Sequence, residues 1–124
     1  MGNSTSWSCV LPAPISVNAM FTNRRGKNMK GRMISPAYLN WRREAEYSLL
    51  LSRPLPQFKG PVAAFLTFQE PTRPNDLDNK AKGILDLLVK HQIIQDDSNK
   101  FLRSLYLSWD KAVTGAHILV KALP

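Results

Sequence analysis

The chain has 124 residues and a mass of 14.0 kDa, which is enough for one domain with a single hydrophobic core and too little for two. Its 17 Lys and Arg residues against 9 Asp and Glu give a formal net charge of +8, so nucleic acid is the favoured partner and a membrane surface the second. No apolar run approaches the length of a membrane span, and no secretory signal is recognisable. With its lone Cys9 unable to form an internal disulfide, we expect a soluble, cytoplasmic protein.

The N-terminal half predicts a strand, a basic loop and a helix. The first residues, MGNSTS, match the pattern for N-myristoylation, and residues 1–5 are expected to be flexible. Residues 6–16 alternate until Pro12 and Pro14, which predicts a strand and an extended turn. Residues 23–34 read as a basic loop with little to bury. Its basic side chains are Arg24, Arg25, Lys27, Lys30 and Arg32.

Ser35 followed by Pro36 is a favourable N-cap and first-turn pair, which predicts a helix over residues 36–52. The apolar stripe of this helix consists of Tyr38, Trp41, Ala45 and Leu49. Arg42 and Arg43 lie away from the stripe, so we expect them to bind DNA phosphates together with the basic loop.

The C-terminal half predicts a proline-rich linker over residues 53–61, a strand over 62–70 and, after a break, a second helix. The buried face of this helix consists of Leu77, Ala81, Ile84, Leu85 and Leu88. Residues 101–109 and 115–123 alternate and predict a terminal hairpin. The order of elements indicates one α+β domain over residues 1–124, with two main helices packed on a mixed or antiparallel sheet.

Acidic residues gather in one part of this basic chain. The five between residues 76 and 97 are Asp76, Asp78, Asp86, Asp96 and Asp97. In one interpretation Asp76 is an N-cap, Asp78 complements the helix dipole, and Asp96 and Asp97 form a solvated turn. In the other, two carboxylate pairs at the ends of a helix-and-return unit approach each other and hold Mg²⁺ or Mn²⁺, whose shell is completed by water and phosphate oxygens.

Such a metal site would hydrolyse a phosphodiester. Lys82, one turn after Asp78 on the same helix face, then either donates to the scissile phosphate or forms an ion pair with Asp78. An EF-hand starting at Asp76 is excluded, because Ala81 and Leu87 occupy the positions of its glycine and glutamate.

Taken together, DLDNKAKGILDLL, the intervening VKHQIIQ and the following DDSNK resemble the signature of the RusA-type Holliday junction resolvases. LPAPISVN, residues 11–18, resembles that family's opening strand and proline turn. The resemblance implies a homodimeric, Mg²⁺-dependent endonuclease that nicks opposed strands of a four-way DNA junction. Where members of the family commonly have a glycine turn before the acidic pair, this chain has His91 and Gln92.

By motif position, the resemblance assigns site residues. The catalytic and metal-binding aspartates fall on Asp76, Asp78 and Asp97, with Asp96 beside them. The catalytic lysine falls on Lys82, and Asn79 matches the asparagine that follows the Asp-x-Asp element.

Neighbouring side chains of a strand point to opposite faces, so we expect Asp97 to be the ligand and Asp96 to support it or share an ion. A homodimer would place two identical sites on a two-fold symmetric junction. Two alternatives remain: a nucleic-acid-binding protein without catalysis, and a flap or branched-DNA nuclease with the same metal chemistry.

Overall fold

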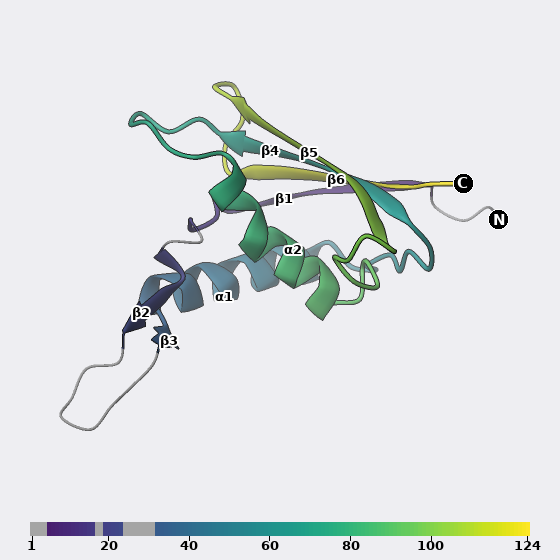
Figure 1. Ribbon diagram of the computed structural model, residues 1–124, viewed down its shortest axis with the longest axis horizontal. Coiled ribbons are helices and arrows are strands. Elements are labelled where there is room, and N and C mark those ends of the chain that lie inside the picture. The colour runs from purple at the N-terminus through teal and green to yellow at the C-terminus, as the bar shows by residue number, and fades with distance from the viewer. Residues whose placement is uncertain (1–4, 17–18, 24–31) are drawn as a thin grey trace.

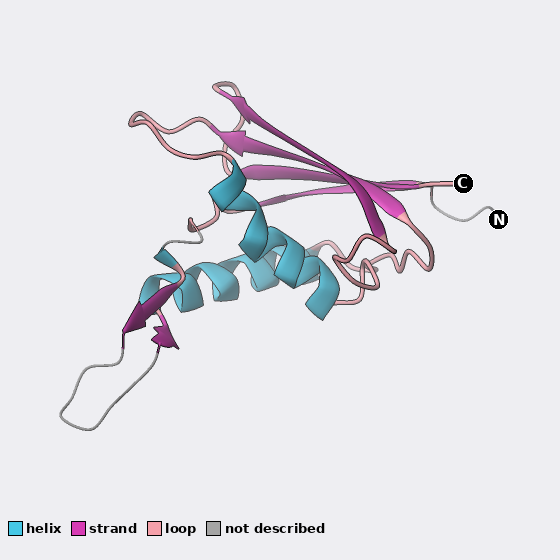
Figure 2. Ribbon diagram, in the orientation of Figure 1, coloured by secondary structure: helices cyan, strands magenta, loops and turns pink. Residues whose placement is uncertain are grey.

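The computed structural model describes residues 5–16, 19–23 and 32–124, which form a four-stranded sheet, a short two-stranded sheet and two α-helices (Figure 1). In chain order the elements are β1 (Ser6–Leu11), β2 (Phe21–Asn23), β3 (Arg32–Ile34), α1 (Pro36–Leu51), β4 (Val62–Gln69), the 3-10 helix η2 (Asp78–Lys80), α2 (Ala81–Lys90), β5 (Leu102–Asp110) and β6 (Ala116–Ala122). Both α-helices lie on the same side of the larger sheet (Figure 2). Of the end expected to be flexible, residues 1–4, including the candidate acceptor Gly2, lie outside the described residues.

The strand order of the larger sheet is β1-β6-β4-β5, with β4 and β5 parallel and the other neighbours antiparallel. The α+β prediction with a mixed sheet is therefore confirmed. The predicted terminal hairpin is wrong, because β4 lies between β5 and β6. The reason is burial: Val62, Ala64 and Leu66 of β4 are fully buried, so this apolar strand takes the centre and β5 becomes an edge.

Helix α1 begins as its sequence predicts. The backbone N–H of Tyr38 donates to Ser35 Oγ at 3.1 Å, and Pro36 occupies the first turn. The predicted apolar stripe is confirmed, since all four of its residues are buried: Tyr38, Trp41, Ala45 and Leu49. The indole N–H of Trp41 also donates to Pro12 O at 3.0 Å, which ties the helix to the turn after β1.

Helix α2 packs on α1 and on the sheet. Ala81, Ile84, Leu85 and Leu88 of its predicted apolar face are buried, and Leu77 is half-buried just before the helix. Gly83 lets the two helices approach closely, because a Cβ at this position would lie 2.9 Å from Cζ3 of Trp41. No helix in the described part of the chain is long and apolar enough to cross a bilayer.

Candidate active site

The first acidic pair lies where the β4–α2 connection enters its helix. Asp76 is exposed and precedes η2, whereas Asp78, also exposed, is the first residue of η2. Oδ2 of Asp76 accepts a hydrogen bond from the side-chain amide of Asn79 at 3.4 Å. Asp76 is not an N-cap, because the residue in that position of η2 is Leu77 and no side chain caps the helix. The capping interpretation therefore does not account for Asp76.

Lys82 is the second residue of α2 and lies in a negative electrostatic environment. Its Nζ is 3.0 Å from Oδ1 of Asp86, one turn later, and both side chains are partly exposed. The hydrogen bond to Asp86 and the charge of that carboxylate raise the pKa of Lys82, and the carboxylate of Asp97 raises it further. Among the described residues, the ion pair of Lys82 is thus with Asp86 and not with Asp78.

Two side chains of α1 complete this charged cluster. Burial raises the pKa of Tyr38 and the charge of Asp86 raises it further, while Arg42 and Lys82 act in the opposite direction. The guanidinium carbon of Arg42 lies 5.7 Å from the centroid of the Tyr38 ring. Neither Asp86 nor Tyr38 is among the site residues expected from the sequence. The spacing of Lys82 and Asp86, four residues apart on a helix, was the available signal for Asp86.

Asp96 and Asp97 lie in the connection between α2 and β5, Asp96 half-buried and Asp97 exposed. The expectation that they belong to a strand is wrong, because β5 begins only at Leu102. The rule of alternating strand faces therefore does not apply to this pair. Their positions depend instead on how α2 ends.

Helix α2 ends in a Schellman motif built around Gln92, which has a φ of +60°. The N–H of Ile93 donates to Leu88 O at 2.9 Å, and the N–H of Gln92 donates to Val89 O at 3.0 Å. The carbonyl of Ile93 then accepts from Phe58 N at 2.9 Å, which fixes the chain that leads to Asp96. Gln92, one of the two residues that stand where the resemblance implies a glycine turn, thus adopts the left-handed conformation itself.

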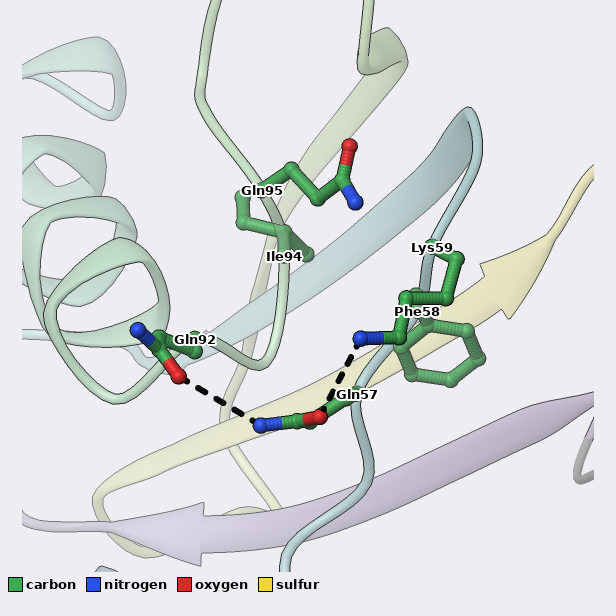
Figure 3. Close-up of a pocket in the computed structure, with 6 residues that line it drawn as sticks. All are labelled: Gln57, Phe58, Lys59, Gln92, Ile94 and Gln95. Atoms are coloured by element: carbon green, nitrogen blue, oxygen red, sulfur yellow. Dashed lines mark hydrogen bonds between the residues drawn. The ribbon is translucent and has the colours of Figure 1, made fainter.

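A polar cavity of about 270 Å³ lies beside this turn (Figure 3). Gln57 bridges its two sides, since its side-chain amide donates to Gln92 Oε1 at 3.4 Å and its oxygen accepts from Lys59 Nζ at 3.4 Å. Gln95, directly before Asp96, also lines the cavity. The Gln57–Gln92 hydrogen bond thus ties the turn at the end of α2 to the linker before β4.

The carboxylates are not assembled into a metal-binding cage. Within residues 5–16, 19–23 and 32–124, no group of three or more His, Cys, Asp or Glu side chains lies close enough to hold an ion. One acidic pair precedes α2 in the chain and the other follows it, and the ten residues of this helix span about 15 Å along its axis. The donor chemistry nevertheless suits Mg²⁺, which binds carboxylate oxygens and completes its shell with water and phosphate oxygens.

Most residues expected to contact DNA lie outside the described part of the chain. These are Arg24, Arg25, Lys27 and Lys30, and for Arg32, at the start of β3, the structure describes the backbone alone. Arg43 is exposed on α1, and Arg42 is half-buried over Tyr38.

The domain is basic and α+β, and it carries exposed aspartates before and after α2 in the chain. These are the features of a nuclease that acts on DNA. The model of the family described as Endodeoxyribonuclease RusA matches residues 12–120. A comparison with curated proteins found no match. Because the matched region spans more than half of the chain, the protein belongs to the RusA family. Its function is that of the family, an endonuclease that resolves Holliday junctions.

Proposed function

We propose that Asp76, Asp78 and Asp97 hold Mg²⁺ and that Lys82 contacts the scissile phosphate of a four-way DNA junction, which is nicked in opposed strands. Mn²⁺ could replace Mg²⁺, because the proposed ligands are all oxygens. The observation that carries this proposal is electrostatic. The carboxylate of Asp97, in the connection that follows α2, raises the pKa of Lys82 at the start of α2. Asp97 therefore lies close enough to Lys82 for the two charges to interact.

The bound ion would lower the pKa of a water molecule and neutralise charge that develops on the phosphate oxygens. Lys82 carries an ammonium at neutral pH, as lysines ordinarily do, and the neighbouring carboxylate of Asp86, which raises its pKa, favours that charged form further. The ammonium can donate to a phosphate oxygen. Asp86 holds this ammonium through a 3.0 Å contact, so we assign Asp86 a positioning role. Asn79 restrains the carboxylate of Asp76 through its amide. Asp96 supports Asp97, its neighbour in the chain.

Separate Asp78→Asn and Asp97→Asn variants test the metal site. Each change removes one negative charge and a strong oxygen ligand at nearly constant volume, so cleavage of a synthetic mobile junction in Mg²⁺ should fall by orders of magnitude. Both residues are exposed, so the melting temperature should stay close to that of the parent. Junction affinity in EDTA should be retained or rise, because repulsion of the phosphates decreases.

Glu44→Gln is the matched control, because Glu44 is an exposed acid on α1 outside the proposed site. It should cut at the parental rate. A stable Asp78→Asn or Asp97→Asn variant that also cuts at the parental rate would exclude that aspartate from the active site. Paired nicks in opposed strands would separate junction resolution from flap cleavage.

The proposal includes a homodimer. A four-way junction has two equivalent strands to cut, and two copies of one site related by a two-fold axis match that symmetry. Arg43 and the basic residues between β2 and β3 would bind phosphates on both arms, with recognition dependent on junction shape.

A further inference from the structure

Two adjoining cavities lie at the ends of β4 and β5, next to the connection that carries Asp76. Their volumes are about 180 and 350 Å³, and both are lined by Glu70, Pro71 and Trp109. The smaller one reaches Pro14 and Lys80, and the larger one follows the chain as far as Asn75. In Figure 1 this connection, drawn in teal, projects beyond the end of β4 before it turns into α2. The cleft therefore ends next to the first acidic residue of the site.

Trp109 provides an aromatic wall that is held in place. Its ring meets Phe68 edge-on, with centroids 6.0 Å apart and an angle of 61° between the planes. The side chain is only half-buried and lines both cavities, so part of the indole remains accessible. An accessible indole restrained from one side can stack on a flat ligand with little loss of side-chain entropy.

Two cations and one carboxylate surround this wall. Lys80 Nζ donates to Pro14 O at 3.4 Å, and in the described part of the chain no carboxylate forms an ion pair with it. Arg73 lines the larger cavity, and Glu70 offers a carboxylate acceptor in both.

An aromatic face, cations and one acceptor match the parts of a nucleotide: a base that stacks, a phosphate that takes the cation and an exocyclic amine that donates to a carboxylate. The net charge of +8 favours an anionic ligand of this kind over a cationic or an apolar ligand. We propose that this cleft binds one unstacked nucleotide of the DNA substrate, with its base against Trp109 and its phosphate at Lys80. The proposal rests on the DNA substrate of the proposed function and adds a subsite that positions a strand beside Asp76.

Fluorescence anisotropy in EDTA, where cleavage is prevented, tests the subsite on three labelled probes: a single-stranded oligonucleotide, a fully paired linear duplex and a four-way junction. Trp109→Ala should weaken binding of the single strand by roughly tenfold and also weaken binding of the junction. Duplex binding should not change, because a continuous duplex offers no unstacked base. Trp109→Phe, which keeps an aromatic face, should retain most of the affinity.

Tyr106→Ala is the matched control. Tyr106 is an exposed aromatic residue of the same strand on the opposite sheet face, where it stacks on Phe65 at 4.6 Å, so all three affinities should remain at the parental level. Lys80→Met should weaken single-strand binding and reduce the slope of log K against log salt by about one. If Trp109→Ala is too unstable to assay, Trp109→Leu carries the same expectation.

A folded Trp109→Ala or Trp109→Leu variant with parental affinity for the single strand would overturn the subsite, and so would an equal loss on the duplex. These outcomes are independent of the metal site. The probes are bound without metal, and an Asp78→Asn variant that still cuts would refute the metal assignment without changing the effect of Trp109.

Discussion

Gln92 carries a local conformational cost that its neighbours impose. Its φ of +60° lies in the left-handed region, which glycine adopts freely and most other residues avoid. The buried Ile93 that follows must turn back over Leu88, so the chain requires this conformation whatever residue stands there.

Gln92→Gly should therefore stabilise the protein. Relief of the left-handed strain exceeds the added entropy of the unfolded chain, and the exposed 3.4 Å contact to Gln57 contributes little, so we expect a gain of up to about 1 kcal/mol. Urea denaturation measures it. Gln95→Gly is the control, because Gln95 has no positive φ and should lose stability. A loss at Gln92 similar to that at Gln95 would contradict the strain argument.

At Gly83, glycine is required by close packing and not by backbone conformation. Alanine normally improves a helix interior by up to about 1 kcal/mol, but here its Cβ would lie 2.9 Å from Trp41 Cζ3. Trp41 is buried and hydrogen-bonded to Pro12, so we expect Gly83→Ala to destabilise the protein by about 1–3 kcal/mol in urea denaturation. Gly60→Ala, where nothing lies within 4 Å of the added Cβ, should be neutral or stabilising. Equal effects at the two glycines would show that the α1–α2 contact can relax.

At the scale of elements, Glu46 connects the middle of α1 to the end of α2. Its Oε2 lies 2.9 Å from Lys90 Nζ and 2.7 Å from His91 Nε2. Burial alone would raise the pKa of Glu46, but the hydrogen bonds and charges of Lys90 and His91 outweigh it, and the pKa lies below its ordinary value. The folded state therefore favours the ionised carboxylate.

This contact should make stability depend on pH. Its contribution is fully present above the unfolded pKa of about 4.3 and is lost as the pH falls through the lower folded pKa. Glu46→Gln should cost about 1 kcal/mol at neutral pH and less in acid, as measured by urea unfolding between about pH 3 and pH 7. Glu44→Gln, on the exposed face of α1, should show no such difference. A loss at Glu46 that is the same at every pH would rule out the ionised contact.

At the scale of the whole molecule, junction resolution should require two copies of the chain. Analytical ultracentrifugation at the concentrations used for cleavage should show a homodimer, and nicks should appear in opposed strands of one junction. Full paired cleavage by a chain that sediments only as a monomer would refute the dimer. A dimer with a single active Asp78 site, formed by mixing parent and Asp78→Asn chains, should nick one strand only.

Local signals in the sequence were sufficient for much of the fold. Ser35 and Pro36 begin α1, the helical spacing of Tyr38 to Leu49 marks its buried face, and the apolar run after Pro61 forms β4. These features depend on contacts between residues a few positions apart, which spacing and capping chemistry encode directly. The paired acidic motifs also identified the family, which the match over residues 12–120 confirmed.

Only the tertiary structure decided which distant segments meet. The alternation of β5 and β6 fits a hairpin as well as separate strands, and β4 lies between them because its buried side chains require neighbours on both sides. Likewise, the position of Asp97 relative to Lys82 depends on the path of the chain after α2, whereas the Lys82–Asp86 pair follows from the spacing of the two residues within the helix. A residue pattern specifies which face is apolar, but the chain selects its neighbours by burying that face in three dimensions.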